Sequence, residues 1–419
     1  MTKNIVIIGG GIVGLSTAWF CQRQGHHVTI VDRKPSQRDG CSFGNAGMLV
    51  PSHIIPLAAP GMIQLGLKWM WNPQSPFYIK PRASLDLVRW MWQFKKSSTR
   101  GHVEKCAPVL RDMHLRSRQL YEQLESDLPG GFGLEQRGLL MLCKTASGLD
   151  EEAKTAAEAE RLGVPAKVLD AAATAELDPD IEMDVAGSVF YPKDCHLSPN
   201  RLMQALESEL VAGGCEFKWE TETIGFTKSP AKIEAVVTNR GELTADEVIV
   251  CGGIWSDQLA RDLNLSLPMQ AGKGYSVTLP QPVQLPQLCS LLHEARVAVT
   301  PMGGALRVGG TMEMAGIDES ITQSRLRGIV KSIPNYFPQF KVDDFAGLST
   351  WSGLRPCSPD GMPYLGRSKR WSNLVVSTGH AMMGISLALV SGEIAADIVC
   401  SKQPKLAGMS LLSPDRFGA

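Results

Sequence analysis

The stretch NIVIIGGGIVGLSTAWFCQRQGHHVTIVDRK, residues 4–34, decides the fold of this chain. Residues 4–8 form a short apolar, β-branched run, which predicts a strand buried on both faces of a parallel sheet. Residues 12–24 have helical spacing and stop at Gly25, and residues 27–32 predict a second strand. The stretch therefore has the pattern of one βαβ unit.

Three glycines, Gly9, Gly11 and Gly14, occupy the turn between the first strand and the helix. In dinucleotide-binding folds the first glycine allows the tight turn, the second lets the main chain approach a pyrophosphate, and the third lets helix and strand pack closely. The helix N-terminus adds N–H groups and a partial positive charge for the phosphates. A glycine turn in an unrelated α/β fold is the alternative.

Asp32 ends the second strand, where its carboxylate can accept hydrogen bonds from the ribose hydroxyls of an adenosine. An acid at this place disfavours a 2′-phosphate and so argues against NADP. We therefore predict that residues 4–34 bind a dinucleotide, and that Arg33, directly after the acid, also contacts it.

Composition narrows the class of protein. A chain of 419 residues with 44% hydrophobic residues is long enough for two packed domains. Lys plus Arg equals Asp plus Glu at 42 each, which gives no support for a nucleic-acid partner. Ten cysteines without a CxxC pair indicate reduced thiols in the cytoplasm, and we expect no metal site.

The N-terminus does not have the pattern of a targeting segment. Only Lys3 precedes the first strand, no small-residue cleavage site follows, and glycines break the apolar run. No uninterrupted apolar run reaches roughly 18 residues, so we expect no membrane-spanning helix.

The remaining chain alternates between two kinds of pattern. Helical patterns cover 104–127, 147–177 and 198–212, and strand–turn–helix patterns cover 244–260 and 373–399. Residues 278–280, 296–301 and 305–313 predict antiparallel strands. The fold class we predict is α/β, with a Rossmann-like dinucleotide domain built from separated segments and an interleaved mixed-sheet α+β domain. The predicted boundaries are 1–60, 195–260 and 345–419 for the first domain, and 61–194 and 261–344 for the second.

Several further motifs resemble one family. The segments GGGIVGLSTAW, SFGNAG with the following VPS and APG, KGYSVTL, RVGGTME, GLRPCSPDGMPYLG and STGHAMMGIS occur in the order seen in the FAD-dependent D-amino-acid oxidase superfamily. The likeness runs from residue 4 to about 400 and is greatest to bacterial D-amino-acid dehydrogenases and their D-hydroxyproline-oxidising relatives. Residues 357–359 depart from the family, with Cys-Ser-Pro where many relatives have Thr before the Pro.

The resemblance implies FAD as cofactor and a small amino acid as substrate. The reaction it implies is dehydrogenation or oxidative deamination of a D-amino acid or a D-proline or hydroxyproline compound, by hydride transfer from Cα to the flavin. An oxygen-using amino-acid or sarcosine/glycine-type oxidase is the alternative, because the sequence does not separate oxygen from a quinone of the respiratory chain as electron acceptor. An NAD-dependent dehydrogenase and a non-catalytic flavoprotein are more distant alternatives. The oligomeric state stays open.

Arg355, in GLRP, is the leading catalytic candidate by this resemblance. Its planar guanidinium can hold an α-carboxylate through two parallel hydrogen bonds. His53 and Tyr275 are further candidates to line the substrate pocket, each with a structural role as the alternative. Cys357 is interpreted as a buried thiol and not as a covalent flavin tether.

Two segments match the family where its chain passes the flavin. Small residues suit a main chain that lies against a flat ring, and a helix N-terminus suits the flavin edge that gains negative charge on reduction. His380 either contacts the flavin or is packed at its turn. The predicted cofactor contacts in these segments are Ser42, Asn45, Ala46, Gly47, Gly379, His380 and Gly384.

An aromatic segment, residues 69–94, has two interpretations. Its tryptophans, with nearby Lys95, Lys96 and Arg100, suit a peripheral contact with the inner face of the membrane. The same side chains also suit the core between helices of the second domain. The tryptophans concerned are Trp69, Trp71, Trp90 and Trp92.

Overall fold

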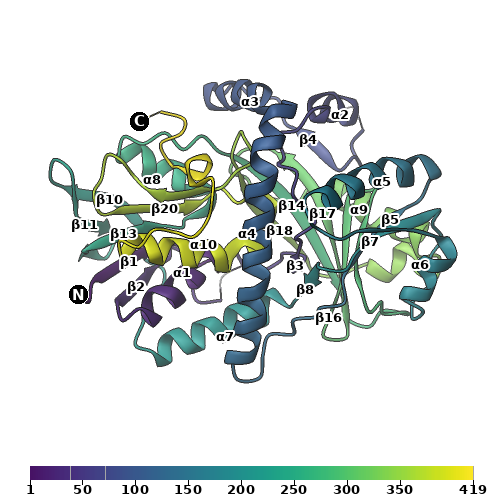
Figure 1. The fold of residues 1–419 in the computed structure, drawn as a ribbon, viewed down its shortest axis with the longest axis horizontal. Helices are drawn as coiled ribbons and strands as arrows, with labels where there is room; N and C mark the ends of the chain where they lie inside the picture. Colours follow the sequence, from purple (N-terminus) through teal and green to yellow (C-terminus); the bar gives the residue numbers. More distant parts are fainter. Residues whose placement is uncertain (38, 71, 419) are drawn as a thin grey trace.

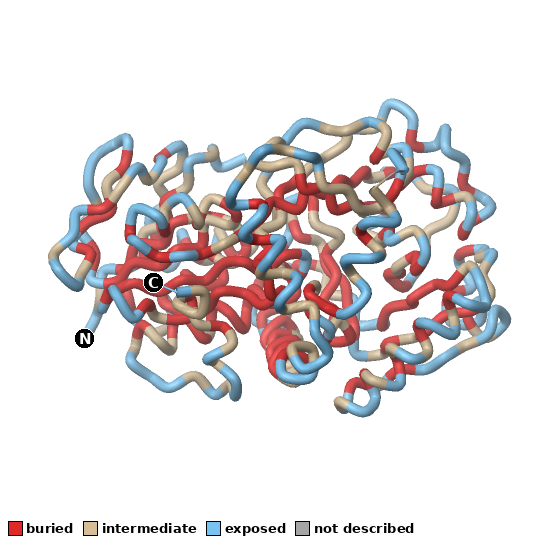
Figure 2. The backbone as a smooth tube through the Cα atoms, turned by 90° about the horizontal axis from the view of Figure 1, so that it is seen from above, coloured by how far each residue is buried: buried red, intermediate tan, exposed pale blue. Residues whose placement is uncertain are grey.

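Two large β-sheets lie side by side, and the long helix α4 (Arg100–Asp127) crosses where they meet (Figure 1). The computed structural model describes residues 1–37, 39–70 and 72–418. Trp71, one of the tryptophans of the aromatic segment, lies outside the described residues. In the tube view the strands of both sheets are buried and the exposed chain lies at the periphery (Figure 2).

The first sheet has six strands in the order β19-β20-β13-β1-β2-β9. β1 pairs in parallel with β2 and β13, and only β19 is antiparallel to its neighbour. Helix α1 begins at Ile12, directly after the glycine turn, so the predicted βαβ unit is confirmed. The strands are β1 (Asn4–Ile8), β2 (His27–Val31), β9 (Glu216–Lys218), β13 (Glu247–Val250), β19 (Tyr364–Arg367) and β20 (Leu374–Thr378).

Helices cover one face of this sheet and a small antiparallel sheet covers the other. Alternate residues of β1 divide between the two faces: Ile5 and Ile7 pack against the helices, whereas Val6 and Ile8 pack on the small sheet. Such burial on both sides explains the continuous apolar run. The covering elements are α1 (Ile12–Arg23), α7 (Pro199–Ala212) and α10 (Gly384–Val399) on one side, and β10 (Thr223–Lys228), β11 (Ile233–Thr238), β12 (Gly241–Thr244) and α8 (Ser256–Asp262) on the other.

The segment Ala381–Val399, which includes α10, is long and apolar enough to cross a membrane, which the sequence reading did not expect. Two-thirds of it is buried inside the protein (67%), and Gly392 brings it onto the backbone of α1 at Ser16. A Cβ at Gly392 would lie 2.7 Å from the Ser16 carbonyl carbon. This burial favours a core helix.

The second sheet has nine strands, eight of them in the order β18-β14-β17-β16-β15-β5-β7-β6, with β4 paired to β17. One face packs on α9 (Gln323–Tyr336) and the other on α5 (Ala146–Arg161) and the segment that follows β3 (Met48–Leu49). The predicted antiparallel strands between 278 and 313 are confirmed by β14, β16 and β17. The strands are β4 (Phe77–Ile79), β5 (Leu139–Cys143), β6 (Lys167–Asp170), β7 (Gly187–Tyr191), β14 (Gln270–Leu279), β15 (Cys289–Leu292), β16 (Val297–Met302), β17 (Ala305–Met314) and β18 (Thr350–Cys357).

The structure divides the chain differently from the sequence patterns in two places. The helical pattern 147–177 is interrupted by strand β6, because Gly163 adopts a left-handed conformation (φ 81°) and Pro165 follows it. Strand β18, within the predicted first domain, pairs with β14 of the second sheet. The other elements here are α2 (Met62–Trp69), α3 (Leu85–Ser97), α5 (Ala146–Arg161), α6 (Ala171–Leu177), α9 (Gln323–Tyr336), and the pair β3 (Met48–Leu49) and β8 (Cys195–His196).

Candidate active site

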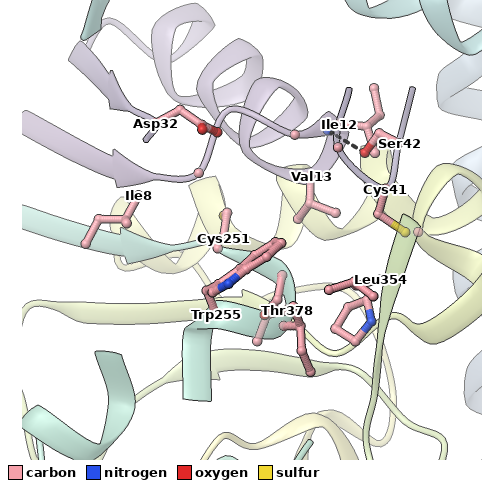
Figure 3. A pocket seen from close by; sticks show the side chains of 18 of the residues that line it. Ile8, Ile12, Val13, Asp32, Cys41, Ser42, Cys251, Trp255, Leu354 and Thr378 are labelled. Carbon is pink, nitrogen blue, oxygen red and sulfur yellow. Dashed lines mark hydrogen bonds between the residues drawn. The ribbon is translucent and has the colours of Figure 1, made fainter. Parts of the chain in front are cut away.

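A cavity opens at the carboxyl ends of β1, β2, β13 and β20. Its lining comes from the glycine turn after β1, the end of β2, residues 40–45, the turn 251–255 and the start of α10 (Figure 3). Strand ends at the point where a doubly wound sheet reverses its order are the usual place for a ligand in such folds. The lining includes eight of the predicted cofactor contacts: Gly9, Gly11, Asp32, Arg33, Ser42, Asn45, His380 and Gly384.

The three glycines of the turn have distinct geometry. Gly9 has φ 115°, and a Cβ there would lie 2.5 Å from the Cys251 carbonyl oxygen. A Cβ at Gly14 would lie 1.9 Å from the Gly9 carbonyl oxygen, so any larger residue would push α1 off the turn. At Gly11 the nearest atom to a Cβ is the Ser42 Oγ, at 3.4 Å, and the main chain there faces the cavity. The turn thus leaves a cradle of backbone beside the N-terminus of α1.

Asp32 is oriented by two backbone donors. Gly10 N–H donates to its Oδ2 at 2.7 Å and Lys34 N–H donates to its Oδ1 at 2.8 Å. The next residue, Arg33, places its guanidinium over the Trp255 ring, 3.8 Å from the centroid. Both Arg33 and Trp255 line the cavity. Trp255 was not predicted as a site residue. The strand–turn–helix pattern at 244–260 did place it in a turn after a strand, where such folds bind ligands.

The segment after Gly40 supplies one wall of the cavity. Ser42 Oγ accepts a hydrogen bond from Ile12 N–H at 3.1 Å, which ties the segment to the N-terminus of α1 (Figure 3). Asn45 holds a turn by accepting from Gly47 N–H at 2.8 Å. Ala46 and Gly47 do not line the cavity. Ala46 packs against an apolar cluster, and Gly47 (φ 71°) approaches the Leu197 carbonyl.

The turn before α10 supplies the opposite wall. Gly384 lines the cavity at the first residue of the helix, whereas Gly379 (φ 78°) does not and instead packs against the Tyr364 ring. His380 is buried, and its Nε2 lies 2.9 Å from the Ser391 hydroxyl. Burial lowers the pKa of His380 to about 4, so its ring is neutral at physiological pH. The structure therefore gives this ring a partner inside α10 itself.

Arg355 lies on β18 between two residues that line the cavity, Leu354 and Pro356. Its guanidinium lies over Gly274 of β14, and its Nη1 donates to the Thr311 carbonyl at 2.6 Å. Among the described residues, the Thr311 carbonyl is the only acceptor of a hydrogen bond from the guanidinium. Burial raises the pKa of Cys41, which lines the cavity, and the positive charge of Arg355 opposes that rise. Arg355 itself does not line the cavity; it lies beside it, near Cys41, and most of its N–H groups have no acceptor among the described residues.

The structure does not bring Tyr275 to the cavity. Its ring is fully buried in the cluster between the second sheet and α9, and its hydroxyl donates to Glu313. Strand pleating explains the placement, because Gly274 faces Arg355 and the next residue must face the other side of the sheet.

His53 follows β3 and does not line the cavity either. Its Nδ1 lies 3.1 Å from the Ser52 hydroxyl, which donates to Asp194 at 2.5 Å. Burial lowers the pKa of His53. Cys357, interpreted from the sequence as a buried thiol, is fully buried and unpaired.

Comparison with known proteins identifies the class. The family model described as FAD dependent oxidoreductase matches residues 4–398, and the chain belongs to this family. Among curated proteins, the D-amino acid dehydrogenase of Granulibacter bethesdensis is 31% identical over 408 residues, covering 96% of this chain and 97% of that protein. The D-amino acid dehydrogenase of Bradyrhizobium diazoefficiens is 31% identical over 427 residues, covering 99% of each chain.

Solved structures share the fold. Glycine oxidase from Geobacillus kaustophilus superimposes with a TM-score of 0.80 at 22% identity, covering 99% of each chain. L-proline dehydrogenase from P. horikoshii superimposes with a TM-score of 0.71 at 20% identity, covering 99% of this chain and 98% of that one. The predicted fold class and the predicted FAD dependence are thereby confirmed.

The residues of the cavity fit FAD. The glycine cradle and the N-terminus of α1, whose N-cap residue Gly11 has no side chain, suit the pyrophosphate. The oriented Asp32 carboxylate suits the ribose, and the Arg33–Trp255 pair offers a flat surface beside it. The N-terminus of α10, with its partial positive charge, suits the end of the cofactor that carries the flavin ring.

Proposed function

We propose that this protein dehydrogenates a small amino acid at its Cα–N bond, with a D-amino acid or a D-proline-type compound as substrate. Full-length relatives that are 31% identical are named D-amino acid dehydrogenases, which supports the stereochemistry and the reaction. Solved structures of the same fold include a glycine oxidase and an L-proline dehydrogenase, so the fold itself accommodates several small amino acids.

The single observation that carries the proposal is the placement of Arg355. It is a cation beside the cavity, with one of its N–H groups satisfied by Thr311 and the planar fork otherwise available to a carboxylate. Gly274 leaves room for the guanidinium to lie flat on the sheet. A carboxylate bound there would hold the neighbouring Cα beside the cavity.

When bound, FAD supplies the acceptor for the hydride that leaves Cα. The chain's own contribution is to hold the substrate carboxylate and to set the distance and angle of the Cα–H bond. No titratable side chain of this chain is required as a base, because water can take the ammonium proton. We therefore assign positioning, and not acid–base chemistry, to the residues around Arg355.

We further propose that the electron acceptor is a quinone of a respiratory chain, with a cytoplasmic enzyme in peripheral contact with the membrane. The name dehydrogenase carried by the curated relatives supports this acceptor over oxygen. An oxygen-using oxidase is the second candidate, and the glycine oxidase fold match supports it. We also propose the division of the chain that the sequence predicts, into a flavin domain and a substrate domain. The cavity would then lie between the two sheets.

The test is anaerobic bleaching of the bound flavin by D- and L-amino acids, sarcosine and hydroxyprolines, with reoxidation by air or by a soluble quinone. We expect bleaching by D-isomers and fast reoxidation by the quinone. Arg355→Ala should keep its flavin and lose on the order of 3–5 kcal/mol in kcat/KM, as expected when a buried carboxylate loses its charged partner.

Arg355→Lys keeps the charge without the fork, and Arg327→Ala, an exposed arginine on α9, is the matched control. The lysine variant should fall between wild type and alanine, and Arg327→Ala should match wild type. Wild-type kinetics in Arg355→Ala would end the proposal.

A further inference from the structure

Two short helices expose an unusual amount of apolar surface. Helices α2 and α3 carry six of the exposed large apolar side chains of the described chain, and Figure 1 shows both helices along one edge of the molecule. On α3 the exposed positions 85, 88 and 92 follow helical spacing and form one stripe. The side chains, with their exposed fractions, are Ile63 (37%), Leu67 (60%), Leu85 (77%), Val88 (57%), Met91 (39%) and Trp92 (57%).

Contacts on the buried side of α3 keep this stripe exposed to solvent. Trp90 is buried, and its Nε1 donates to the Cys357 carbonyl at 2.9 Å. Phe94 stacks on Trp90 with ring centroids 5.0 Å apart. Each of the two interpretations of the aromatic segment therefore holds for one tryptophan of α3. Trp90 lies in the core, and Trp92 lies on the surface.

Helix α2 is anchored to the same cluster. Its Gly66 approaches the Phe77 ring of β4 so closely that a Cβ would lie 2.9 Å away, and Phe77 packs on the cluster that contains Trp90. The apolar side chains of α2 that face outward have no place in this cluster. The outward faces of α2 and α3 together, defined by the six side chains above, form one surface that we call the apolar edge.

The segment of chain that carries the apolar edge is basic in sequence. Over residues 41–100 the sequence has seven Lys or Arg and a single acid, Asp86, in a chain whose formal net charge is zero. Asp86 is paired with Arg261 at 2.8 Å, so it does not offset the lysines, and of the basic residues Arg100 is paired with Glu104 at 3.1 Å. Lys96 Nζ lies 3.5 Å from the Trp92 ring centroid, as a lysine does when its stem covers an apolar surface. The basic residues are Lys68, Lys80, Arg82, Arg89, Lys95, Lys96 and Arg100.

We infer that the apolar edge docks on the surface of a bilayer that contains anionic lipid. Amphipathic helices with large apolar residues on one side and lysines or arginines around them lie in the membrane interface, where apolar burial and attraction to acidic headgroups add. A second copy of the chain fits less well, because a two-fold contact would bring like charges together. The inference rests on the proposed function, which includes a peripheral contact with the membrane, and it assigns that contact to one surface of the protein.

The apolar edge is attached to strands that also hold Arg355. Strand β4, which anchors α2, pairs with β17 one residue after Thr311, the acceptor for Arg355. Trp90 of α3 bonds the backbone of β18 two residues after Arg355. The docked face is thus fastened to the same strands that hold the substrate anchor.

The experiment is sedimentation of the full-length, flavin-loaded protein with vesicles of phosphatidylcholine alone or mixed with phosphatidylglycerol. Wild type should pellet with the mixed vesicles, and less so in high salt. Lys95→Gln/Lys96→Gln should bind the mixed vesicles at least about tenfold more weakly. Leu67→Gln/Val88→Gln/Trp92→Gln should lose about tenfold or more on the same vesicles.

The matched control is Val168→Gln/Val211→Gln/Val283→Gln, which removes three comparably exposed apolar side chains elsewhere. It should bind vesicles like wild type, and every variant should reduce a water-soluble dye at the wild-type rate. The inference is overturned if wild type stays in the supernatant, or if the apolar-edge variant pellets like wild type. Loss of a wild-type dimer in the apolar-edge variant, without loss of vesicle binding, would assign the surface to a second copy instead.

Discussion

The guanidinium of Arg355 lies directly over the α-carbon of Gly274 on the neighbouring strand. A Cβ at position 274 would lie 2.2 Å from Nη2 and 2.3 Å from Cζ, closer than any real contact. Two strands of one sheet therefore determine where this cation lies: β18 carries Arg355, and β14 leaves space for its guanidinium at Gly274.

Gly274→Ala should displace this guanidinium while its charge stays in the protein. We expect KM for the amino acid to rise about 10–100-fold, because misplacement by about 1 Å is enough to lose productive geometry. Flavin content, measured by absorbance after dialysis, should not change. Gly101→Ala, at an open position on α4, is the control. Unaltered kinetics in Gly274→Ala would show that the guanidinium does not bind the substrate.

Asp32→Ala should weaken retention of FAD. The carboxylate is held by Gly10 and Lys34 N–H groups, so its orientation toward the cavity is fixed before the cofactor binds. Removing a charged acceptor of this kind costs about 1.5–3 kcal/mol, which corresponds to a Kd roughly 10–100-fold higher. Titration of apoprotein with FAD, followed by flavin fluorescence, measures it. Asp150→Ala, an exposed acid on α5, should bind FAD like wild type, and equal Kd values for both variants would contradict the assignment.

Tyr275→Phe should affect stability more than catalysis. The hydroxyl donates to buried Glu313 and accepts from Thr322 N–H, so its loss leaves polar groups without a partner. We expect the free energy of unfolding to fall by about 1–3 kcal/mol, measured by urea unfolding, and kcat/KM to stay near the wild-type value. A large fall in kcat with unchanged stability would restore Tyr275 as a catalytic residue.

Asp194 should make stability depend on pH. The side chain is fully buried, and burial raises its pKa to about 7, although the Ser52 hydroxyl and N–H both donate to it. Between about pH 4, where an unfolded aspartate titrates, and pH 7, the native protein holds one more proton than the unfolded chain. The free energy of unfolding therefore receives a contribution that decreases as pH rises through this window.

Asp194→Asn should remove that contribution, since the amide keeps an acceptor for Ser52 and does not ionise. Relative to wild type, the variant should gain on the order of 2–4 kcal/mol between about pH 4 and about pH 8. The two proteins differ only at position 194, so the comparison isolates the contribution of this residue. Urea unfolding at several pH values measures the difference, and a constant difference across the range would rule out titration of Asp194.

The glycine motif and Asp32 could be read from the chain because their function depends on local geometry. A turn needs positive φ, a helix needs close approach, and the spacing between strand ends is fixed by the length of one βαβ unit. Arg33 and Trp255 show the limit of that reading. They are separated by more than two hundred residues and meet only because β13 pairs with β1.

The sequence by itself determined the dinucleotide fold, the family and the residues of the glycine turn, since neighbours in the chain make these features. The tertiary structure decided which candidates reach the cavity: strand pleating turned Tyr275 into the core and left Arg355 over Gly274, beside the cavity. It also divided Trp90 from Trp92, one buried and one exposed on the same helix. The reason is that the side of a strand or helix that a residue faces depends on what packs against it, and those partners lie far away in the chain.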